Sequence, residues 1–269
     1  MKLSVIIPTR QRPEWLSRAL RSVFQTKNVP FDLEVVVTDN SLDDRCLEVV
    51  EKLDWQEVRY FRNQPPTGMV ENWNVGIMRS TGDVILILHD DDYLLLGWEK
   101  KIKNLMQRAN LNREVHAFSV QSVNESEVPL WRGGRHRSRS TTAEEAVCLL
   151  LTHSSFVRFP GMVVGRKCYE ELGLFCPDFQ ETADLEMWLR LGAYGGIHFH
   201  KELLSAYTIH AGAMTQGMFS LETLQNIHRL GEMSAERNAI AGKDLVRARR
   251  LFFGGLFWRE PGGLGRLDA

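Results

Sequence analysis

Short runs of β-branched residues alternate with helical patterns along the first part of the chain, and this alternation constrains the fold more than any other feature. Strand patterns occupy residues 3–8, 33–39, 58–61 and 84–88, and helical patterns lie between them. Strands that alternate with helices of this length form right-handed βαβ units, in which the strands pair in parallel and helices cover both sheet faces. We therefore predict an α/β fold with a mostly parallel central sheet flanked by helices.

Two of these runs are apolar throughout, VVV at 35–37 and VILIL at 84–88. A strand without polar alternation is buried on both faces, so both runs are predicted at the centre of the sheet. Helix ends can also be read from the sequence. Pro13 is expected in a first helical turn, and Gly82 is expected to close a helix that starts near Thr67.

The alternation fades after about residue 115. Residues 124–142 read as a long irregular segment, and its basic part at 132–139 is either a linker or a mobile lid that brings Arg135 or Arg137 towards phosphate. Further strand and helix patterns follow up to about residue 210.

The chain ends in two helical patterns, at about 218–240 and 243–258. We therefore divide it into an α/β half at 1–115, a second half of the same domain at 116–216 and a C-terminal helical extension at 217–269. The extension mixes basic and aromatic residues, which suits peripheral contact with an anionic membrane, packing on the body of the protein or a homodimer.

Charge and cysteine content narrow the class of protein. The chain has 33 Lys and Arg residues and 34 Asp and Glu residues. This balance gives no global attraction to nucleic acid, so we expect no nucleic-acid partner. The four cysteines contain no CxxC pair, which is typical of reduced thiols in a cytosolic protein. Since no segment approaches the ~20 apolar residues that span a bilayer, we predict a cytoplasmic protein.

Polar side chains follow three of the predicted strands: Pro8-Thr9-Arg10, Asp39-Asn40-Ser41 and His89-Asp90-Asp91-Asp92. In open α/β sheets, ligands bind beyond the carboxyl ends of the strands, and parallel pairing places the three clusters on one edge. Each of the first two clusters also has an ordinary explanation. The Asp39 turn can cap the next helix, and Arg10 can be a solvated surface charge.

The third cluster places three adjacent carboxylates at the end of a buried strand. Such charges repel each other unless water or a cation neutralises them, and clustered carboxylates favour hard divalent ions. Mg²⁺ or Mn²⁺ held by one or two carboxylates keeps open positions for the phosphate oxygens of a substrate. A metal site that binds a diphosphate is thus predicted at the end of this strand.

The motifs together resemble the family 2 glycosyltransferases, inverting enzymes of the GT-A fold that use nucleotide-diphosphate sugars. The resemblance covers roughly residues 2–216 in the expected order, through SVIIPTRQRPEWLSRALRSVFQ, the Asp39 turn, NWNVGI, ILILHDDDYL, DLEMWLRL and YTIHAGAMT. The resemblance implies that residues 1–115 bind the nucleotide sugar and that residues 116–216 form the acceptor side.

The resemblance also implies roles for residues of the donor site. Pro8, Thr9 and Arg10 would line the nucleotide pocket, and Asp39 would accept a hydrogen bond from the base, typically uracil. Asn72 or Asn74 would lie near the nucleotide or the donor sugar.

The cluster at 89–92 stands in the place of the family's DxD motif, with His89 where the first Asp is common. Asp91 is then the principal metal ligand, and Asp90 contacts the ribose or acts as a second ligand. Asp92 would cap or brace the loop, and His210 matches a histidine that in many relatives binds the metal or the diphosphate. The cofactor would be Mn²⁺ or Mg²⁺.

Inverting transfer also needs a carboxylate that takes the proton of the acceptor hydroxyl. Asp184 begins a helix, and from the residues alone it either stabilises that helix or acts as the base. The resemblance favours the base, because the family's catalytic Asp precedes a helix reading WLRL, as Trp188 to Leu191 do here. The family often has Glu directly before that Asp, whereas this chain has Ala183, with Glu181 further back.

We therefore expect a metal-dependent inverting glycosyltransferase that moves a hexose-type sugar from a UDP-sugar to a glycan or lipid-linked hydroxyl acceptor, in bacterial surface polysaccharide or glycolipid synthesis. Two alternatives remain. One is a catalytically inactive protein of the same fold that binds nucleotide sugars or glycans. The other is a sugar nucleotidyltransferase, although IIPTRQRPE lacks the glycine-rich phosphate loop that such enzymes need.

Overall fold

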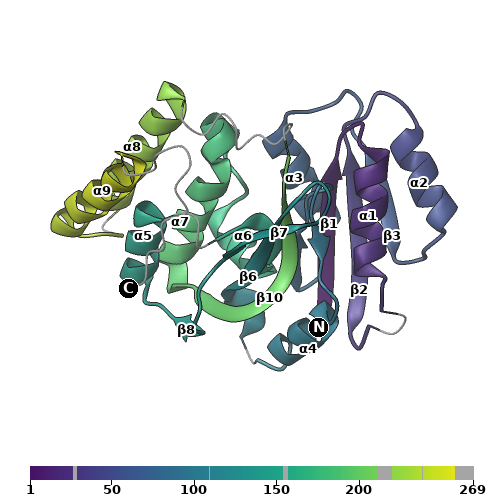
Figure 1. The fold of residues 1–269 in the computed structure, drawn as a ribbon, viewed down its shortest axis with the longest axis horizontal. Coiled ribbons are helices and arrows are strands. Elements are labelled where there is room, and N and C mark those ends of the chain that lie inside the picture. Colours follow the sequence, from purple (N-terminus) through teal and green to yellow (C-terminus); the bar gives the residue numbers. More distant parts are fainter. Residues whose placement is uncertain (27–28, 109, 154–156, 211–219, 238, 258–269) are drawn as a thin grey trace.

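The computed structural model describes residues 1–26, 29–108, 110–153, 157–210, 220–237 and 239–257. Its first half contains the predicted alternation of strands and helices (Figure 1). The elements are β1 (Lys2–Thr9), α1 (Pro13–Val23), β2 (Asp32–Asp39), α2 (Arg45–Leu53), β3 (Val58–Arg62), α3 (Met69–Arg79) and β4 (Val84–Ile87).

The second half contains more helices and strands than the sequence predicted. It contains β5 (Tyr93–Leu94), α4 (Trp98–Leu105), η1 (Leu111–Arg113), β6 (Val115–Asn124), β7 (Pro129–Gly133), β8 (Arg139–Ser140), α5 (Ala143–Thr152), η3 (Phe159–Gly161), β9 (Met162–Gly165), α6 (Arg166–Leu172), η4 (Pro177–Thr182), α7 (Ala183–Gly195), β10 (His198–Ile209), α8 (Leu221–Glu236) and α9 (Gly242–Phe257).

One sheet runs through both halves in the order β3-β2-β1-β4-β9-β6-β10-β5. The strands of the first half pair in parallel, as predicted. Beyond β4 the sheet is mixed, because β9 runs antiparallel to both β4 and β6, while β6 and β10 pair in parallel. The sheet therefore crosses the boundary expected after residue 115. The boundary expected after residue 216 lies outside the described residues.

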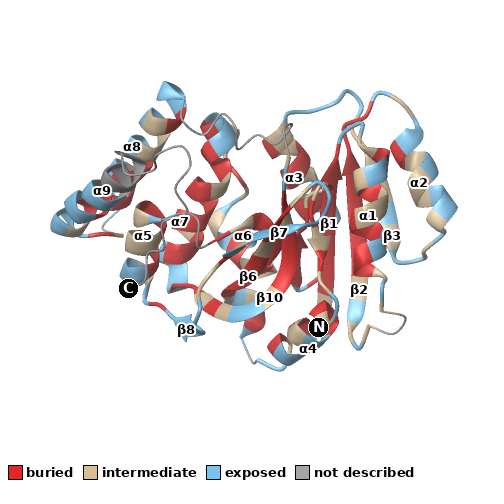
Figure 2. Cartoon of the chain, viewed as in Figure 1, coloured by how far each residue is buried: buried red, intermediate tan, exposed pale blue. Residues whose placement is uncertain are grey.

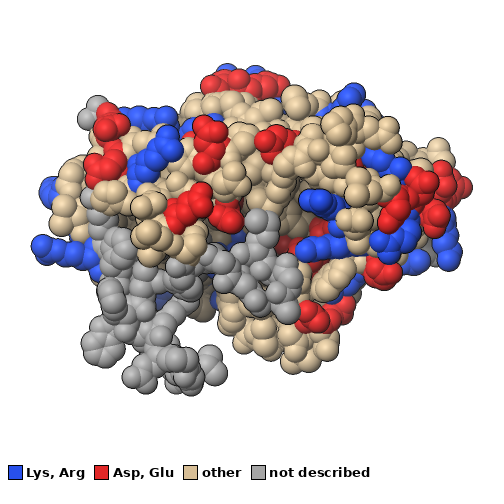
Figure 3. Space-filling view, turned by 90° about the horizontal axis from the view of Figure 1, so that it is seen from above, with Lys and Arg blue, Asp and Glu red and all other residues tan. Residues whose placement is uncertain are grey.

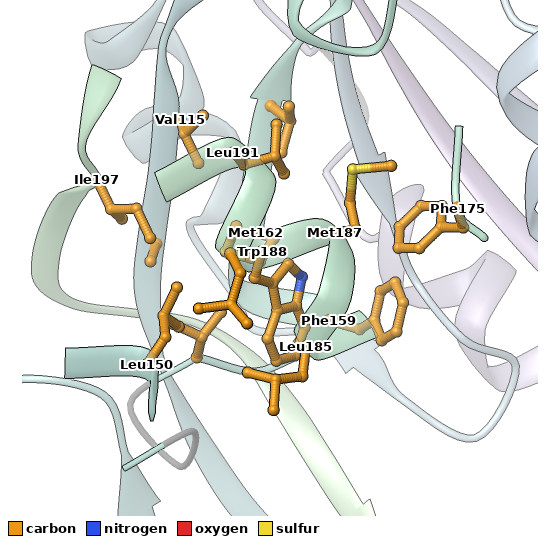
Figure 4. Packing of buried hydrophobic residues seen from close by; sticks show 14 of the residues in the cluster. Val115, Leu150, Phe159, Met162, Phe175, Leu185, Met187, Trp188, Leu191 and Ile197 are labelled. Atoms are coloured by element: carbon orange, nitrogen blue, oxygen red, sulfur yellow. The ribbon is translucent and has the colours of Figure 1, made fainter. Parts of the chain in front are cut away.

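Alternate residues of the central strands face opposite layers of helices. Leu3, Val5 and Ile7 of β1 pack with α1, α2 and α4, whereas Ile6 packs with α3. Helices α5, α6 and α7 join α3 on this second face. Figure 4 shows apolar side chains of α5 and α7 in this layer, and Figure 2 shows the buried strands between the layers. Burial on both faces explains why these strands are apolar throughout.

The segment expected to be irregular at 124–142 is largely ordered, and that prediction was wrong. β6 extends to Asn124 and forms an antiparallel hairpin with β7, and β8 pairs with β10. Within the basic stretch, the Arg135 guanidinium lies 5.8 Å from the ring centre of Phe199, at the start of β10. Arg135 is thus at the opposite end of the strand from the carboxyl edge where a phosphate is expected. Helix-breaking glycines and exposed charges hid the strand pairing.

Gly82 does not close α3, which ends at Arg79 with Ser80 in extended conformation. A Cβ at Gly82 would lie 2.7 Å from the main-chain nitrogen of Ser4 and 2.8 Å from the carbonyl oxygen of Lys2. The glycine is needed because the backbone passes this close to the start of β1.

The C-terminal helices α8 and α9 lie at the end of the molecule farthest from α1 and α2 (Figure 1). Leu230 of α8 and Leu245 and Ala248 of α9 are buried against the body of the protein, so packing on the body accounts for one face of this extension. The outer face of α9 exposes Lys243 and Arg247. No helix among the described residues is long and apolar enough to cross a membrane.

Glu34 forms a buried ionic network at the edge of the sheet opposite the predicted site. Its carboxylate accepts hydrogen bonds from Ser4 Oγ at 2.6 Å, from Lys2 Nζ at 3.0 Å and from the main chain of Thr81 and Gly82. Burial by itself would raise the pKa of Glu34, but these hydrogen bonds outweigh it and lower the pKa to about 2.

Replacement of Glu34 by glutamine is therefore expected to lower the free energy of unfolding by about 2–3 kcal/mol at neutral pH. Because the pKa of the folded state is depressed, this contribution is complete above the ordinary value of 4.5 and is lost as the pH falls towards about 2. Urea unfolding at pH 7 and pH 3 measures both effects, with exposed Glu51→Gln as the control. A loss below about 0.5 kcal/mol at pH 7 would contradict the assignment.

Candidate active site

The ends of β1, β2 and β4 bring the three predicted polar clusters to one edge. Thr9 pairs with Asp39 in the sheet register, and the N–H of Asn40 donates to the carbonyl of Thr9. The Ser41 hydroxyl accepts from the N–H of Gln11 at 2.6 Å. Figure 3 looks down on this edge and shows basic and acidic side chains gathered over the N-terminal half of the chain.

Residues 89–92, which we name the acidic turn, follow β4 after Leu88. The Thr9 hydroxyl donates to Asp90 Oδ2 at 2.8 Å. Arg12 Nη1 lies 3.4 Å from Asp90 Oδ1 and 3.1 Å from Asp91 Oδ2. The loop after β1 therefore contacts two of the three carboxylates.

The end of β10 approaches the acidic turn from the second half of the chain. The N–H of Thr208 donates to Asp92 Oδ1 at 2.9 Å, which supports the bracing role predicted for Asp92. His210 Nε2 lies 2.9 Å from Asp91 Oδ2. The two residues predicted to share a metal are thus in contact, although 119 positions separate them in the sequence.

His89 packs against two aromatic rings beside the same carboxylates. Its ring centre lies 5.4 Å from that of Trp73 and 4.5 Å from that of Phe159. Its Nε2 atom is buried and has no hydrogen-bond partner among the described residues. Ligand atoms of His89, Asp91 and Asp92 all lie within 4.8 Å of one another.

These donors fit a divalent ion. Two ligands on neighbouring corners of an octahedral site with bonds of about 2.1 Å lie about 3 Å apart, close to the separation of His210 Nε2 and Asp91 Oδ2. Carboxylate oxygen with imidazole nitrogen suits Mn²⁺ better than Mg²⁺, which prefers oxygen alone. A ring nitrogen of His89 offers a third or alternative donor to this site.

The electrostatics of the turn also call for a cation. Burial and the charge of Asp91 raise the pKa of Asp90 to about 6 and raise that of Asp92 well above its usual range. For Asp91, burial is outweighed by the hydrogen bond from His210 and by the charges of His89 and Arg12, so its pKa is lowered. Asp91 is therefore the carboxylate that ionises most readily.

Two residues predicted to contact the nucleotide are held firmly at the edge. Asp39 is fully buried, and its two oxygens accept hydrogen bonds from the N–H of Ser41 at 2.7 Å and from the Tyr60 hydroxyl at 2.5 Å. Asn72 donates to the carbonyl of Thr38 and accepts from Asn63 Nδ2 at 2.7 Å. Their orientation is fixed before any ligand arrives.

The other three residues predicted around the nucleotide differ in position. Pro8 is buried in β1 and Arg10 is exposed beyond it. Asn74 points away from this group, because its amide exchanges two hydrogen bonds with the main chain of Phe175, at 2.8 and 3.0 Å. Asn74 thus joins α3 to the segment before η4 and leaves Asn72 as the asparagine at the edge.

Asp184 lies at the start of α7, after a segment in which Gln180 adopts a left-handed φ of 46°. Its Oδ1 accepts from the N–H of Leu185 at 2.6 Å. The residue is partly exposed as a whole, but burial of its carboxyl raises the pKa to about 6, against the lowering charge of Arg158.

Helix α7 connects to the acidic turn through aromatic rings. Trp188 packs edge to face on Phe159 with ring centres 5.6 Å apart, and Phe159 in turn contacts His89. Figure 4 shows Trp188 and Phe159 side by side in this cluster. The candidate metal site and the helix that carries the candidate base thus pack on the same aromatic cluster.

Comparison with known proteins identifies the fold around this site. The family model described as Glycosyl transferase family 2 matches residues 4–173, more than half of the 269 residues. The chain belongs to glycosyl transferase family 2. The predicted family is therefore confirmed, and with it the expectation of a glycosyltransferase at the level of the family.

Curated relatives of this glycosyl transferase family 2 chain align over part of their length. The GalNAc(5)-diNAcBac-PP-undecaprenol beta-1,3-glucosyltransferase of Campylobacter jejuni is 39% identical over 113 residues, which cover 40% of this chain and 35% of that protein. An uncharacterized glycosyltransferase of Haemophilus influenzae is 33% identical over 124 residues, which cover 46% of this chain and 41% of that protein. The chain thus spans less than half the length of these two relatives.

Solved structures confirm the predicted GT-A fold. TarS of S. aureus, residues 1–349 in complex with UDP-GlcNAc, matches with a TM-score of 0.71 at 18% identity, over 95% of this chain and 72% of that one. GalNAc-T7 with UDP, GalNAc and Mn²⁺ matches with a TM-score of 0.63 at 17% identity, over 86% of this chain and 48% of that one.

Several residues around the site of this family 2 chain were missed from the sequence. Arg12 and Arg18 contact the acidic turn, Trp15 packs on His210 with ring centres 5.2 Å apart, and Tyr60 donates to Asp39. Arg12 carried a readable signal, since it stands two positions after Arg10 in the same loop. Arg18 and Tyr60 carried none, because each contacts residues far away in the sequence.

Proposed function

We propose that this chain is a metal-dependent inverting glycosyltransferase that moves a sugar from a UDP-sugar to a hydroxyl acceptor. The observation that carries the proposal is the 2.9 Å contact between Asp91 and His210, at the edge where the ends of β1, β2 and β4 meet. This edge has the donors for a divalent ion. Asp184, in α7, provides a separate carboxylate.

The donor is proposed from chemistry and from the neighbours together. TarS was solved with UDP-GlcNAc and with UDP, and GalNAc-T7 with UDP and Mn²⁺. The buried carboxylate of Asp39, fixed by Tyr60, offers acceptor oxygens to the N–H of a base such as uracil. Thr9, Arg10 and Asn72 are proposed to line the same nucleotide pocket, with Asp90 near the ribose.

The acceptor is proposed to be a glycan or lipid-linked hydroxyl in bacterial surface polysaccharide or glycolipid synthesis. The name of the C. jejuni relative specifies an undecaprenol-linked glycan, and that of TarS a poly(ribitol-phosphate). We keep cytoplasmic localisation, peripheral contact of the basic outer face of α9 with a membrane and a homodimer as predictions. Flotation with anionic vesicles and light scattering test the last two.

In the proposed reaction the acceptor oxygen attacks the anomeric carbon as the bond from that carbon to the diphosphate oxygen breaks. The hydroxyl proton passes to the carboxylate of Asp184, and UDP leaves with the bonding electrons. Asp91 and His210, with His89 or Asp90 beside them, would hold Mn²⁺ or Mg²⁺, which supplies positive charge to the leaving diphosphate. The main chain of Leu185 orients the base.

The pH dependence of transfer follows from the base. Asp184 accepts a proton only when it is ionised, and its pKa is raised to about 6, mainly by burial. We therefore expect kcat to fall about tenfold per pH unit below 6 and to level off above about 7. A profile of initial rates between pH 4.5 and 8.5 at saturating donor and Mn²⁺ measures this. A rate independent of pH between 5 and 7 would exclude Asp184 as the base.

The direct test of the proposed function is turnover of UDP-sugars by the purified chain. UDP-glucose, UDP-GlcNAc and UDP-GalNAc are each incubated with Mn²⁺, with water in place of the acceptor hydroxyl, and UDP release is measured. We expect release from at least one donor, its loss with excess EDTA and its return when Mn²⁺ is added. Release that is unaffected by EDTA would contradict the metal site, and release from none of the donors would contradict the donor class.

A further inference from the structure

Arg18 of α1 joins the segments that meet at the acidic turn. Its Nη2 donates to the main-chain carbonyl of Asp91 and to Thr208 Oγ1, the latter at 3.0 Å. Its Nη1 lies 3.4 Å from Glu127 Oε1 in the hairpin between β6 and β7. One side chain thus contacts the acidic turn, the end of β10 and the hairpin.

The orientation of this guanidinium is fixed by two aromatic rings. It lies 4.4 Å from the ring centre of Trp15 and 4.8 Å from that of Tyr93. Stacking on aromatic faces leaves the edges of a planar guanidinium available for hydrogen bonds in set directions. Arg18 can therefore hold the carbonyl of Asp91 in a defined place.

Trp15 extends this support to the second candidate ligand. Residues three apart lie on the same face of a helix, so Trp15 and Arg18 form one surface of α1. Trp15 packs on the ring of His210, while Arg18 bonds the backbone of Asp91. Asp91 and His210 come from segments far apart in the sequence, and this surface of α1 contacts both.

We propose that Arg18 is a positioning residue that fixes the geometry of Asp91 against His210 and so sets the metal affinity of the site. This inference rests on the proposed function. A ligand must be held to within about 0.5 Å to bind well, and losing an outer partner of a metal ligand costs about 10- to 100-fold in affinity.

A purely structural role is the competing explanation, because a half-buried arginine with these contacts also stabilises the fold. The two roles differ in their effect on metal binding by the folded protein. A structural residue changes the free energy of unfolding alone, whereas a positioning residue also changes the affinity of the folded chain for Mn²⁺.

The test is the Kd of Mn²⁺ for the full chain in the presence of a fixed concentration of UDP, measured by titration calorimetry and by the Mn²⁺ electron paramagnetic resonance signal. We expect Arg18→Met to weaken Mn²⁺ binding at least tenfold. Arg18→Lys should recover only part of the loss, because it keeps the charge but not the planar fork. Thr208→Val, which removes one contact of Arg18, should weaken binding about threefold and serves as the informative variant if Arg18→Met does not fold.

Two controls separate the explanations. Arg21→Met alters an exposed arginine one turn further along α1, and Glu34→Gln destabilises the fold at the opposite edge. Both should keep the wild-type Kd for Mn²⁺. Arg18→Met binding within twofold of wild type, or Glu34→Gln losing as much affinity as Arg18→Met, would overturn the positioning role alone. Wild-type protein that binds no Mn²⁺ would overturn the proposed function as well.

Discussion

Replacement of Asp184 by asparagine is expected to lower kcat of sugar transfer by about 10²- to 10⁴-fold, the range that positioned general bases contribute. Asparagine keeps the shape of the side chain and can still accept from the N–H of Leu185, but it cannot take the proton of the acceptor hydroxyl. The start of α7 should therefore keep its structure. Steady-state rates of transfer, together with the Kd of UDP in the presence of Mn²⁺, measure the two effects separately.

The Kd of UDP with Mn²⁺ is expected to stay within twofold of wild type, since Asp184 lies on α7 and not among the residues around the acidic turn. Glu181→Gln is the matched control, because it removes an exposed carboxylate three residues earlier. A large loss of rate in Glu181→Gln with little change in Asp184→Asn would transfer the role of base to Glu181. Full activity in both variants would show that neither Asp184 nor Glu181 is the base.

The same comparison decides between an enzyme and an inactive binding protein of the same fold. A protein that binds nucleotide sugars without turning them over would show no transfer in the wild type and equal UDP affinity in both variants. The match to glycosyl transferase family 2 argues for the enzyme.

Replacement of Asp91 by asparagine is expected to abolish measurable transfer and to weaken Mn²⁺ binding by more than about 100-fold, beyond the loss that follows removal of an outer partner. The reason is that Asp91 has the lowered pKa in the turn and is 2.9 Å from His210 Nε2. An amide offers one neutral oxygen in place of a charged carboxylate. Calorimetric titration of Mn²⁺ into the chain at a fixed concentration of UDP measures the change.

Asp32→Asn, an exposed aspartate at the start of β2, is the control for the loss of one negative charge. It should bind Mn²⁺ as the wild type does. If Asp91→Asn retains Mn²⁺ affinity and Asp90→Asn or Asp92→Asn loses it, the principal ligand would have to be reassigned within the acidic turn. His89→Ala then tells whether the unpartnered imidazole adds a ligand.

The parallel half of the fold could be read from the sequence because its signals are local. Continuous apolar runs such as 84–88 mark strands buried on both faces, and Pro13 marks the start of α1. The same reasoning failed at 124–142, where mostly exposed residues with two glycines conceal a hairpin. The pairing of β7 with β6 depends on tertiary contacts that no local pattern reports.

The candidate site was predictable in its parts and less so in its assembly. Parallel pairing places Thr9, Asp39 and the acidic turn on one edge, so their proximity follows from strand order alone. Asn74 shows the limit of this reasoning, since its spacing on α3 directs it to Phe175. Arg18 could not be found from the sequence, because its role depends on where β10 ends.

The most direct test of the central claim is isothermal titration of the purified chain with UDP, GDP and dTDP, each with and without Mn²⁺. UDP should bind tightly only when Mn²⁺ is present, and GDP and dTDP should bind more weakly, because Asp39 and the acidic turn would recognise the base and the diphosphate together. Binding of none of the three, or binding of UDP that is equally tight without metal, would contradict the account.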